Sequence, residues 1–196
     1  DSPTMTASTK PEIVQTGPLM AYAADQLKAR FTVHELWKAA DRAALLREVS
    51  GRVRGVAAGG GHNRVDGALF DALPKLEVIS SFGVGYDHVD AAEAGKRGLV
   101  VTNTPDVLTD EVADLALGLL IATVRQLPQV DRYLREGQWL KGNYPLTTSL
   151  RGRKVGIVGL GRIGKAVARR VEAFGLPVVY HGRSRQPDLS YPYYPS

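Results

Sequence analysis

Cysteine is absent from the 196-residue chain, which excludes disulfide bonds, thiolate nucleophiles and cysteine-ligated metals. The chain also lacks an apolar run of about 20 residues, the length that an α-helix needs to cross a bilayer. No secretory signal is recognisable at its start. These absences predict a cytoplasmic protein with no membrane partner.

Histidine is also scarce. It occurs four times, at no spacing with Asp or Glu that indicates a metal site, and no Ser/His/Asp arrangement is evident. The formal charge is +5, but the basic residues are scattered and form no block interleaved with aromatic residues. Nucleic-acid binding is therefore not expected. The charge favours anionic ligands in a general way, and a mildly basic surface is the preferred interpretation of most of these residues. The hydrophobic content of 44% predicts a real core, preceded by a small, polar and mobile tail over residues 1–10.

The most informative segment is KVGIVGLGRIG, residues 154–164. Residues 155–158 form a short, mostly β-branched run that is typical of a buried parallel strand, and helical spacing follows the glycines. Gly159 permits the tight bend, Gly161 lets the backbone approach a pyrophosphate, and Gly164 lets the helix pack closely on the strand. Free N–H groups and the positive dipole end at the helix start complete a phosphate site. The segment predicts a dinucleotide-binding βαβ unit, and a glycine turn without a ligand is the alternative.

The second strand of this unit, predicted over residues 178–180, is soon followed by Arg183, Ser184 and Arg185. An NAD site normally has Asp or Glu there to accept hydrogen bonds from the adenosine ribose, and this chain has no acid at that point. Two guanidinium groups and a hydroxyl suit a 2′-phosphate instead. The sequence therefore predicts NADPH in preference to NADH. The alternative is that both arginines merely belong to a solvated loop.

Strand-like and helix-like segments alternate before the glycine turn. Strands are predicted over residues 13–16, 31–36, 53–58, 78–82 and 99–102, and helices over residues 21–30, 41–49, 66–73 and 89–97. This alternation predicts a parallel sheet with helices on its faces. Ligands of such sheets bind beyond the carboxyl ends of the strands, where the loops 59–62 and 83–87 are rich in glycine.

A long helix is predicted to end near Gln126, with Asp110 and Glu111 at the positive end of its dipole. Its apolar stripe predicts burial between two domains and consists of Val112, Leu115, Ala116, Leu119, Leu120 and Val124. Residues 127–150 follow as a polar helix and an irregular arm with large side chains such as Trp139. Large apolar groups on an arm need a cover. A homodimer through residues 127–150 and a fold-back onto the same subunit are both open.

These segments resemble the D-isomer-specific 2-hydroxyacid dehydrogenases, most closely their glyoxylate/hydroxypyruvate reductase branch. The resemblance is carried by SFGVGYDHVD at 81–90, NTPDVLTD at 103–110 and VGIVGLGRIG at 155–164. The tail from Tyr180 to Tyr194 looks like the NADPH-using members. The resemblance implies an α/β fold with a flavodoxin-like substrate-binding domain over residues 11–104. It also implies a Rossmann-type, doubly wound nucleotide domain over residues 105–196, of which only two strands are expected here.

The resemblance also implies roles for individual residues. Backbone amides of Val84 and Gly85 help to hold the substrate carboxylate, and the Gly59-Gly60 loop faces the same cleft. Arg162 and Ile163 lie along the pyrophosphate. The complete predicted cofactor-binding set is Thr109, Gly159, Gly161, Arg162, Ile163, Gly164, Arg183, Ser184 and Arg185.

The family's chemistry is hydride transfer between nicotinamide C4 and substrate C2, aided by an arginine and by a histidine that a glutamate orients. In the family pattern these three residues lie downstream of the second nucleotide strand. None is therefore assigned in this chain, and the chain alone is expected to be inactive. His88, next to Asp87, is expected to cap the next helix or lie in its first turn rather than to catalyse.

The expected function is reduction of a small 2-keto acid of the glyoxylate or hydroxypyruvate type by NADPH, giving the D-2-hydroxy acid. Two alternatives are open. One is an NAD-dependent member of the family with another substrate. The other is a dinucleotide-sensing protein without catalysis, which the residues downstream of the second nucleotide strand would distinguish from an enzyme.

Overall fold

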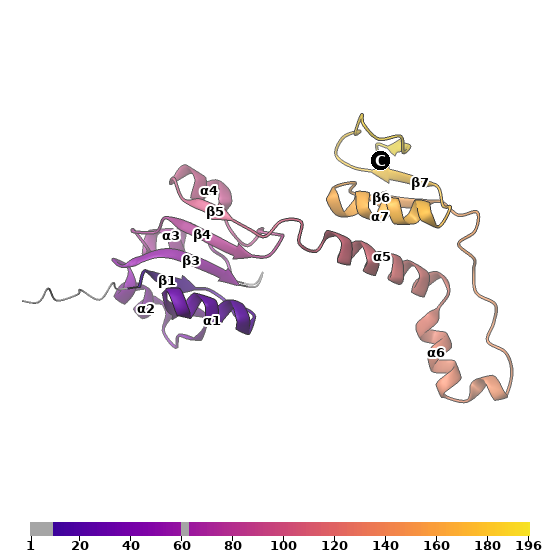
Figure 1. Ribbon diagram of the computed structural model, residues 1–196, viewed down its shortest axis with the longest axis horizontal. Helices are drawn as coiled ribbons and strands as arrows, with labels where there is room; N and C mark the ends of the chain where they lie inside the picture. The colour runs from indigo at the N-terminus through magenta and orange to yellow at the C-terminus, as the bar shows by residue number, and fades with distance from the viewer. Residues whose placement is uncertain (1–9, 60–62) are drawn as a thin grey trace, which may run out of the picture. The chain divides into compact units, whose positions relative to one another are not determined.

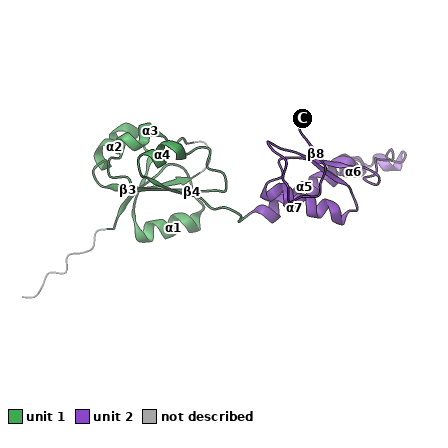
Figure 2. Cartoon of the chain, turned by 90° about the horizontal axis from the view of Figure 1, so that it is seen from above, with its two compact units in different colours: residues 1–107 green, residues 108–196 purple. Residues whose placement is uncertain are grey.

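The computed structural model describes residues 10–59 and 63–196, so the predicted tail lies almost wholly outside the described residues. The chain forms two compact units, residues 1–107 and 108–196 (Figure 2). Along the described residues, none of the helices has the length and apolarity to cross a membrane.

The first unit is a five-stranded parallel sheet covered by helices. Its elements are β1 Glu12–Gln15, α1 Ala21–Arg30, β2 Thr32–Glu35, η1 Leu36–Lys38, α2 Arg42–Val49, β3 Val53–Gly59, α3 Gly67–Ala72, β4 Val78–Phe82, α4 Ala91–Lys96 and β5 Val100–Thr102. The strand order is β2-β1-β3-β4-β5, with every pair parallel. Figure 2 shows α1 on one side of the sheet and α2, α3 and α4 on the other. The predicted parallel α/β sheet is confirmed, in the flavodoxin-type order whose direction reverses between β1 and β3.

The core of this unit lies where the central strands meet the helices. Val14, Val53, Ala58 and Ile79 from β1, β3 and β4 are fully buried, and Phe70 of α3 packs against the same cluster. Central parallel strands are covered on both faces, which explains why β3 is an almost uninterrupted apolar run. This rigid layer carries the loops at its carboxyl edge.

Two predicted boundaries in the first unit differ from the observed ones for local reasons. The second strand stops at Glu35 because Leu36 begins the short helical turn η1. The fourth helix begins at Ala91 because Asp90 is its N-cap, with a side-chain oxygen that accepts the Glu93 N–H at 2.9 Å. The predicted helix start at Val89 was therefore early by two residues.

The second unit stacks helices on a small parallel sheet. Its elements are α5 Thr109–Val124, α6 Leu127–Arg135, η2 Gln138–Leu140, β6 Val155–Val158, α7 Arg162–Ala173, β7 Val178–His181 and β8 Tyr193–Tyr194. Helix α7 lies between α5 and the sheet (Figure 1). Gly175, just beyond the C-terminal end of helix α7, has φ +69°, the left-handed conformation expected after a helix end.

The expectation of only two strands in this unit was wrong. A third strand, β8, pairs in parallel with β7 through Tyr180–Tyr193 and His181–Tyr194, giving the order β6-β7-β8. The connection of residues 182–192 contains no helix, although parallel strands are usually joined through one. Because β8 has two residues and stands between two prolines, it carries too little periodicity to be recognised in the sequence.

Helix α5 packs on α7 through a face that the sequence did not single out. Ala113 and Leu117 are its buried residues, whereas Leu115 and Leu119 of the predicted stripe are 61% and 58% exposed. Leu117 of α5 lies in the same buried cluster as Ala168 and Val171 of α7. Arg170 of α7 adds contacts on α5: its Nε lies 2.5 Å from an Asp114 carboxylate oxygen, and a second nitrogen bonds Asp110 at 3.1 Å.

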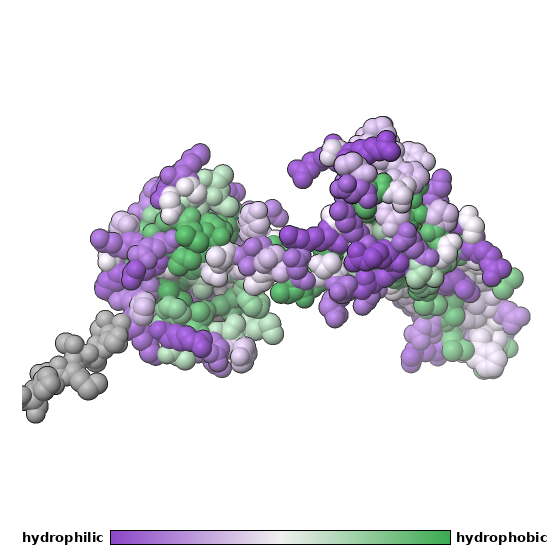
Figure 3. Space-filling view, turned by 45° about the horizontal axis from the view of Figure 1, so that its top comes forward, coloured by the Kyte–Doolittle hydropathy of each residue, from purple (hydrophilic) through white to green (hydrophobic). Residues whose placement is uncertain are grey.

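Residues 127–150 fold back on themselves in part. Tyr133 donates to the Gly142 carbonyl at 2.8 Å, and its ring meets the Tyr144 ring edge-on at 5.2 Å. Trp139 and Leu146 nevertheless remain 55% and 102% exposed. Figure 3 shows apolar residues on the surface of this unit among hydrophilic ones. The predicted homodimer through this segment stays a prediction.

Candidate functional site

The glycine turn joins β6 to α7, and each of its three glycines is favoured for a different structural reason. Gly159 has φ +89°, a conformation that other residues rarely adopt. A Cβ on Gly164 would lie 2.2 Å from the carbonyl oxygen of Gly159, so helix and turn touch backbone to backbone. A Cβ on Gly161 would meet no protein atom within 4 Å. The space beside Gly161 is thus open to a ligand, as a pyrophosphate site requires.

The start of α7 is suited to an anion. Gly161 is the N-cap and provides no side-chain capping hydrogen bond, and the first turn contains no acidic residue. The 12-residue helix therefore has its N-terminal amides and the positive end of its dipole at this turn, with no carboxylate among the residues of the turn itself. Arg162 and Ile163 are the first two residues of this turn, and the pyrophosphate contacts that the resemblance implies for them stay a prediction.

The loop after β7 is attached to the glycine turn. The parallel register pairs Val158 with His181, and the Gly159 N–H donates to the His181 carbonyl at 2.9 Å. The Gln186 side-chain amide then donates to the Leu160 carbonyl within the turn at 2.7 Å. The loop that carries the predicted 2′-phosphate residues is therefore held beside the predicted pyrophosphate turn.

Arg183, Ser184 and Arg185 are all exposed. Within the described residues, neither arginine forms a hydrogen bond or an ion pair with another side chain. Two guanidinium groups without a protein partner are available to an external anion. Binding of a 2′-phosphate by this loop remains a prediction.

The positive charge of the chain is concentrated in the second unit. Residues 108–196 contain 13 of the 25 Lys and Arg residues but only 7 of the 20 Asp and Glu residues, a formal charge of +6. Residues 1–107 carry a formal charge of −1. A polyanionic ligand such as a dinucleotide is electrostatically favoured by the unit that contains the glycine turn.

The loop after β4 presents backbone donors. The Gly83 carbonyl accepts from the Thr104 N–H at 3.0 Å, and the Val84 carbonyl accepts from the Asn103 side-chain amide at 2.8 Å. No peptide of the described residues is cis, so each N–H points opposite to the carbonyl of the same peptide. The amides of Val84 and Gly85 therefore point away from Asn103 and Thr104, and no acceptor for them occurs within the described part of the chain. Such a pair of free amides suits a carboxylate.

His88 anchors this loop rather than capping a helix. Its Nε2 lies 3.2 Å from Oγ of the buried Ser81, at the end of β4. The prediction that His88 caps the next helix or lies in its first turn was wrong, because Asp90 is the cap and α4 begins one residue later. The hydrogen bond joins the two ends of the segment that contains Val84 and Gly85.

The Gly59 position is explained first by packing. A Cβ on Gly59 would lie 2.7 Å from the Pro18 carbonyl oxygen, and one on Gly17 would lie 2.0 Å from the Gly59 oxygen. The backbone just after β1 thus touches the end of β3 at the carboxyl edge of the sheet. Gly17 went unnoticed in the sequence, although it stands where a strand ends before a proline. Gly60 lies outside the described residues, and Thr109 is simply the first residue of α5.

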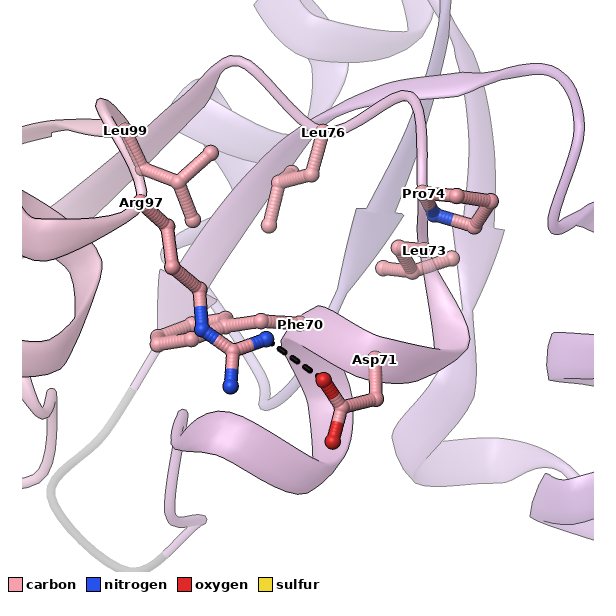
Figure 4. A pocket seen from close by; sticks show the side chains of 7 residues that line it. All are labelled: Phe70, Asp71, Leu73, Pro74, Leu76, Arg97 and Leu99. Carbon is pink, nitrogen blue, oxygen red and sulfur yellow. Dashed lines mark hydrogen bonds and ion pairs between the residues drawn. The ribbon is translucent and has the colours of Figure 1, made fainter.

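A separate hollow of about 330 Å³ lies at the opposite, amino edge of the first sheet. Figure 4 shows it lined by Phe70, Asp71, Leu73, Pro74, Leu76, Arg97 and Leu99. Arg97 lies over the Phe70 ring at 5.6 Å and is paired with Asp71 at 2.5 Å and with Glu93 at 2.9 Å. Because its one cation is already neutralised, this hollow has no charge to offer the anionic ligands that the carboxyl edge suits.

Comparison with known proteins decides the family. The family model described as D-isomer specific 2-hydroxyacid dehydrogenase, catalytic domain, matches residues 13–185. The chain belongs to this dehydrogenase family. A glyoxylate/hydroxypyruvate reductase A of Arabidopsis thaliana is 44% identical over 179 residues, covering 91% of this chain and 57% of the relative. A hydroxyphenylpyruvate reductase of Plectranthus scutellarioides is 46% identical with the same coverage.

Solved structures of the dehydrogenase family have the same fold. An NADPH-dependent glyoxylate/hydroxypyruvate reductase of Sinorhizobium meliloti, in complex with NADP and malonate, is 46% identical with a TM-score of 0.83. The match covers 96% of this chain and 58% of that reductase. The same reductase in complex with citrate gives a TM-score of 0.85. The chain thus spans somewhat more than half the length of the relatives it matches.

Proposed function

We propose that this chain provides the substrate-binding unit and the coenzyme-binding turn of an NADPH-dependent reductase. The substrate is a small 2-keto acid of the glyoxylate or hydroxypyruvate type, and the product is the D-2-hydroxy acid. The observation that carries the proposal is the hydrogen bond from Gln186 to Leu160, which places a loop with two unpaired arginines beside an open glycine turn. The NADP and malonate in the Sinorhizobium meliloti reductase support the same ligand classes.

The residues present fit the coenzyme. The space beside Gly161 accommodates a pyrophosphate, which the N–H groups of Arg162 and Ile163 would hold. Arg183, Ser184 and Arg185 would hold the 2′-phosphate through charge-assisted hydrogen bonds. Bound NADPH supplies a hydride.

The substrate carboxylate would be held by the amides of Val84 and Gly85. Their directions are set before any ligand arrives, because Thr104 and Asn103 hold the carbonyls of the same two peptides. Such preorganisation spares the substrate the cost of ordering the loop. Glyoxylate, hydroxypyruvate and malonate share the carboxylate that these amides would recognise. The family's arginine, glutamate and histidine are assigned to no residue of this chain, so catalysis belongs to the whole protein.

We also propose that residues 127–150 form a homodimer contact. Trp139, Leu140 and Leu146 are each more than half exposed, although the neighbouring Tyr133 and Tyr144 pack on each other. Large apolar side chains on an arm are a common signature of a subunit interface. Light scattering of the chain and of a Trp139→Ser/Leu140→Ser variant tests this: the proposal requires a dimer that the variant weakens.

The coenzyme proposal is tested by titrating NADPH and NADH into the chain and into an Arg183→Ala/Arg185→Ala variant. Loss of two charge-assisted hydrogen bonds predicts a fall in NADPH affinity of about tenfold or more, with NADH affinity changed less than about twofold. An Arg132→Ala/Arg151→Ala variant removes the same charge from the same unit and should retain the preference. Equal affinity of the unchanged chain for NADPH and NADH would contradict the proposal.

A further inference from the structure

The loop between β7 and β8 is fastened on both sides of its arginines. On the amino side, the Tyr193 hydroxyl donates to the Gly182 carbonyl at 3.0 Å. On the carboxyl side, the Gln186 backbone N–H donates to the Tyr180 hydroxyl at 2.8 Å. Only three residues, 183–185, lie between these two anchors.

Of the two anchoring tyrosines, Tyr180 belongs to the core of the second unit and Tyr193 packs against it. Tyr180 is 2% exposed, and its ring lies 5.3 Å from that of Tyr193 in a tilted arrangement. Tyr193 belongs to β8, whose pairing with β7 is extended by a hydrogen bond between His181 Nδ1 and the Tyr194 carbonyl at 2.9 Å. The anchors are therefore set by packed strands, and the two-residue strand β8 serves to place one of them.

The Gln186 side chain makes a third connection, to the glycine turn. Its amide donates to the Leu160 carbonyl at 2.7 Å, and Leu160 itself is 2% exposed. That carbonyl belongs to the peptide that enters Gly161, so the bond also fixes the plane of this peptide. Gln186 thus joins the backbone of the turn to the loop with the arginines.

We propose that Gln186, together with Tyr180 and Tyr193, determines the preference for a 2′-phosphorylated coenzyme by positioning Arg183 and Arg185. The two tyrosine hydroxyls and the Gln186 side-chain amide bond the backbone of the loop and the turn, so these groups act through the arginines. The proposal rests on the proposed NADPH binding and adds which residues make the loop selective. A loop held in its binding conformation loses less entropy when its guanidinium groups order on a phosphate.

The test is calorimetry on the full 196-residue chain with two adenine nucleotides. Adenosine 2′,5′-bisphosphate carries the phosphate at issue, and adenosine 5′-monophosphate lacks it. The ratio of the two affinities measures recognition of the 2′-phosphate and is insensitive to a general loss of folded protein. The variants are Gln186→Met, which keeps the side-chain length without the donor, and Tyr193→Phe, which removes one hydroxyl.

The matched control is Tyr194→Phe. Tyr194 is 47% exposed and contributes only its backbone carbonyl to the contacts of this loop. Each of the first two variants is expected to lower the affinity ratio about fivefold, the effect of losing one hydrogen bond that orders the loop. The Tyr194→Phe ratio should equal that of the unchanged chain. Thermal unfolding of each variant shows whether it folds. If Tyr193→Phe does not fold, Gln186→Met alone tests the proposal.

The outcomes separate this inference from the function on which it rests. If the unchanged chain binds both nucleotides equally, the 2′-phosphate site itself is wrong, and the inference falls with it. If the unchanged chain prefers the bisphosphate and Gln186→Met keeps that ratio, NADPH binding stands and the positioning role is refuted. If Gln186→Met weakens both nucleotides by the same factor, Gln186 supports the turn alone, and the inference is likewise overturned.

Discussion

Replacing Gly164 with alanine should damage the coenzyme turn through one contact. The new Cβ would stand 2.2 Å from the Gly159 carbonyl oxygen and 3.4 Å from a methyl group of Ile157. Ordinary contact distances then require helix and turn to separate by roughly 1 Å. Overpacking of this kind costs about 1–3 kcal/mol, and the better helix propensity of alanine offsets about 1 kcal/mol. The free energy of unfolding of the second unit should therefore fall by up to about 2 kcal/mol.

The same displacement should weaken NADPH binding by more than the stability loss alone. Phosphate donors moved by about 1 Å lose well-aligned hydrogen bonds, so a fall in affinity of about tenfold or more is expected. Thermal unfolding followed by circular dichroism gives the stability, and fluorescence titration with NADPH gives the affinity. Both are measured on the Gly164→Ala chain and on the unchanged chain.

Two other glycines provide matched controls. A Cβ on Gly161 would meet no protein atom within 4 Å, so Gly161→Ala should keep the unfolding temperature and lose NADPH affinity by blocking the close approach of the phosphates. A Cβ on Gly156, within β6, would come no nearer than 3.9 Å to Val179, so Gly156→Ala should change neither quantity much. Unaltered NADPH affinity in Gly164→Ala would refute the assignment of this turn to the coenzyme.

Asn103→Ala removes the donor that fixes the loop after β4, so the affinity for malonate should fall about fivefold. The affinity is measured by following the backbone amide resonances of that loop during a malonate titration. An unchanged affinity would argue against a carboxylate site in this loop. Glu12 accepts a hydrogen bond from His34 and pairs with Arg52, and these contacts lower its pKa. Because the Glu12 pKa is lower in the folded than in the unfolded chain, the ionised carboxylate stabilises the first unit at a pH above the ordinary glutamate pKa. This stabilisation is lost as the pH falls through the lowered pKa. In urea unfolding, the free energy of unfolding should therefore differ less between pH 7 and pH 3 for Glu12→Gln than for the unchanged chain. An equal difference in the two proteins would be evidence against this role of Glu12. Asp41→Ala removes the N-cap of α2 and should cost about 1 kcal/mol in urea unfolding; a change within error would show the cap to be unimportant.

The sequence predicted the elements whose signals are local. The β-branched run before Gly159 and the glycine at 175 mark a strand and a helix end through backbone preferences that need no distant partner. The five strands of the first unit were found for the same reason, as short apolar runs between turn residues. Boundary errors of one or two residues came from capping side chains and from η1.

The features that sequence reasoning missed depend on contacts between distant segments. Strand β8 exists because Tyr193 packs beside Tyr180, and nothing within two residues announces such a contact. His88 bonds Ser81 across the loop rather than the nearer helix. The buried face of α5 was likewise decided by α7, whose Arg170 bonds Asp114. In each case the tertiary partner, not the local pattern, determined the outcome.

We propose that NADPH lies on the turn after Val158, with its 2′-phosphate between Arg183 and Arg185. A crystal structure of the chain soaked with NADPH tests it most directly. We expect density for the pyrophosphate against the backbone at Gly161 and density for the 2′-phosphate in contact with both guanidinium groups. A nucleotide bound elsewhere, or a 2′-phosphate that points into solvent away from the loop, would contradict it.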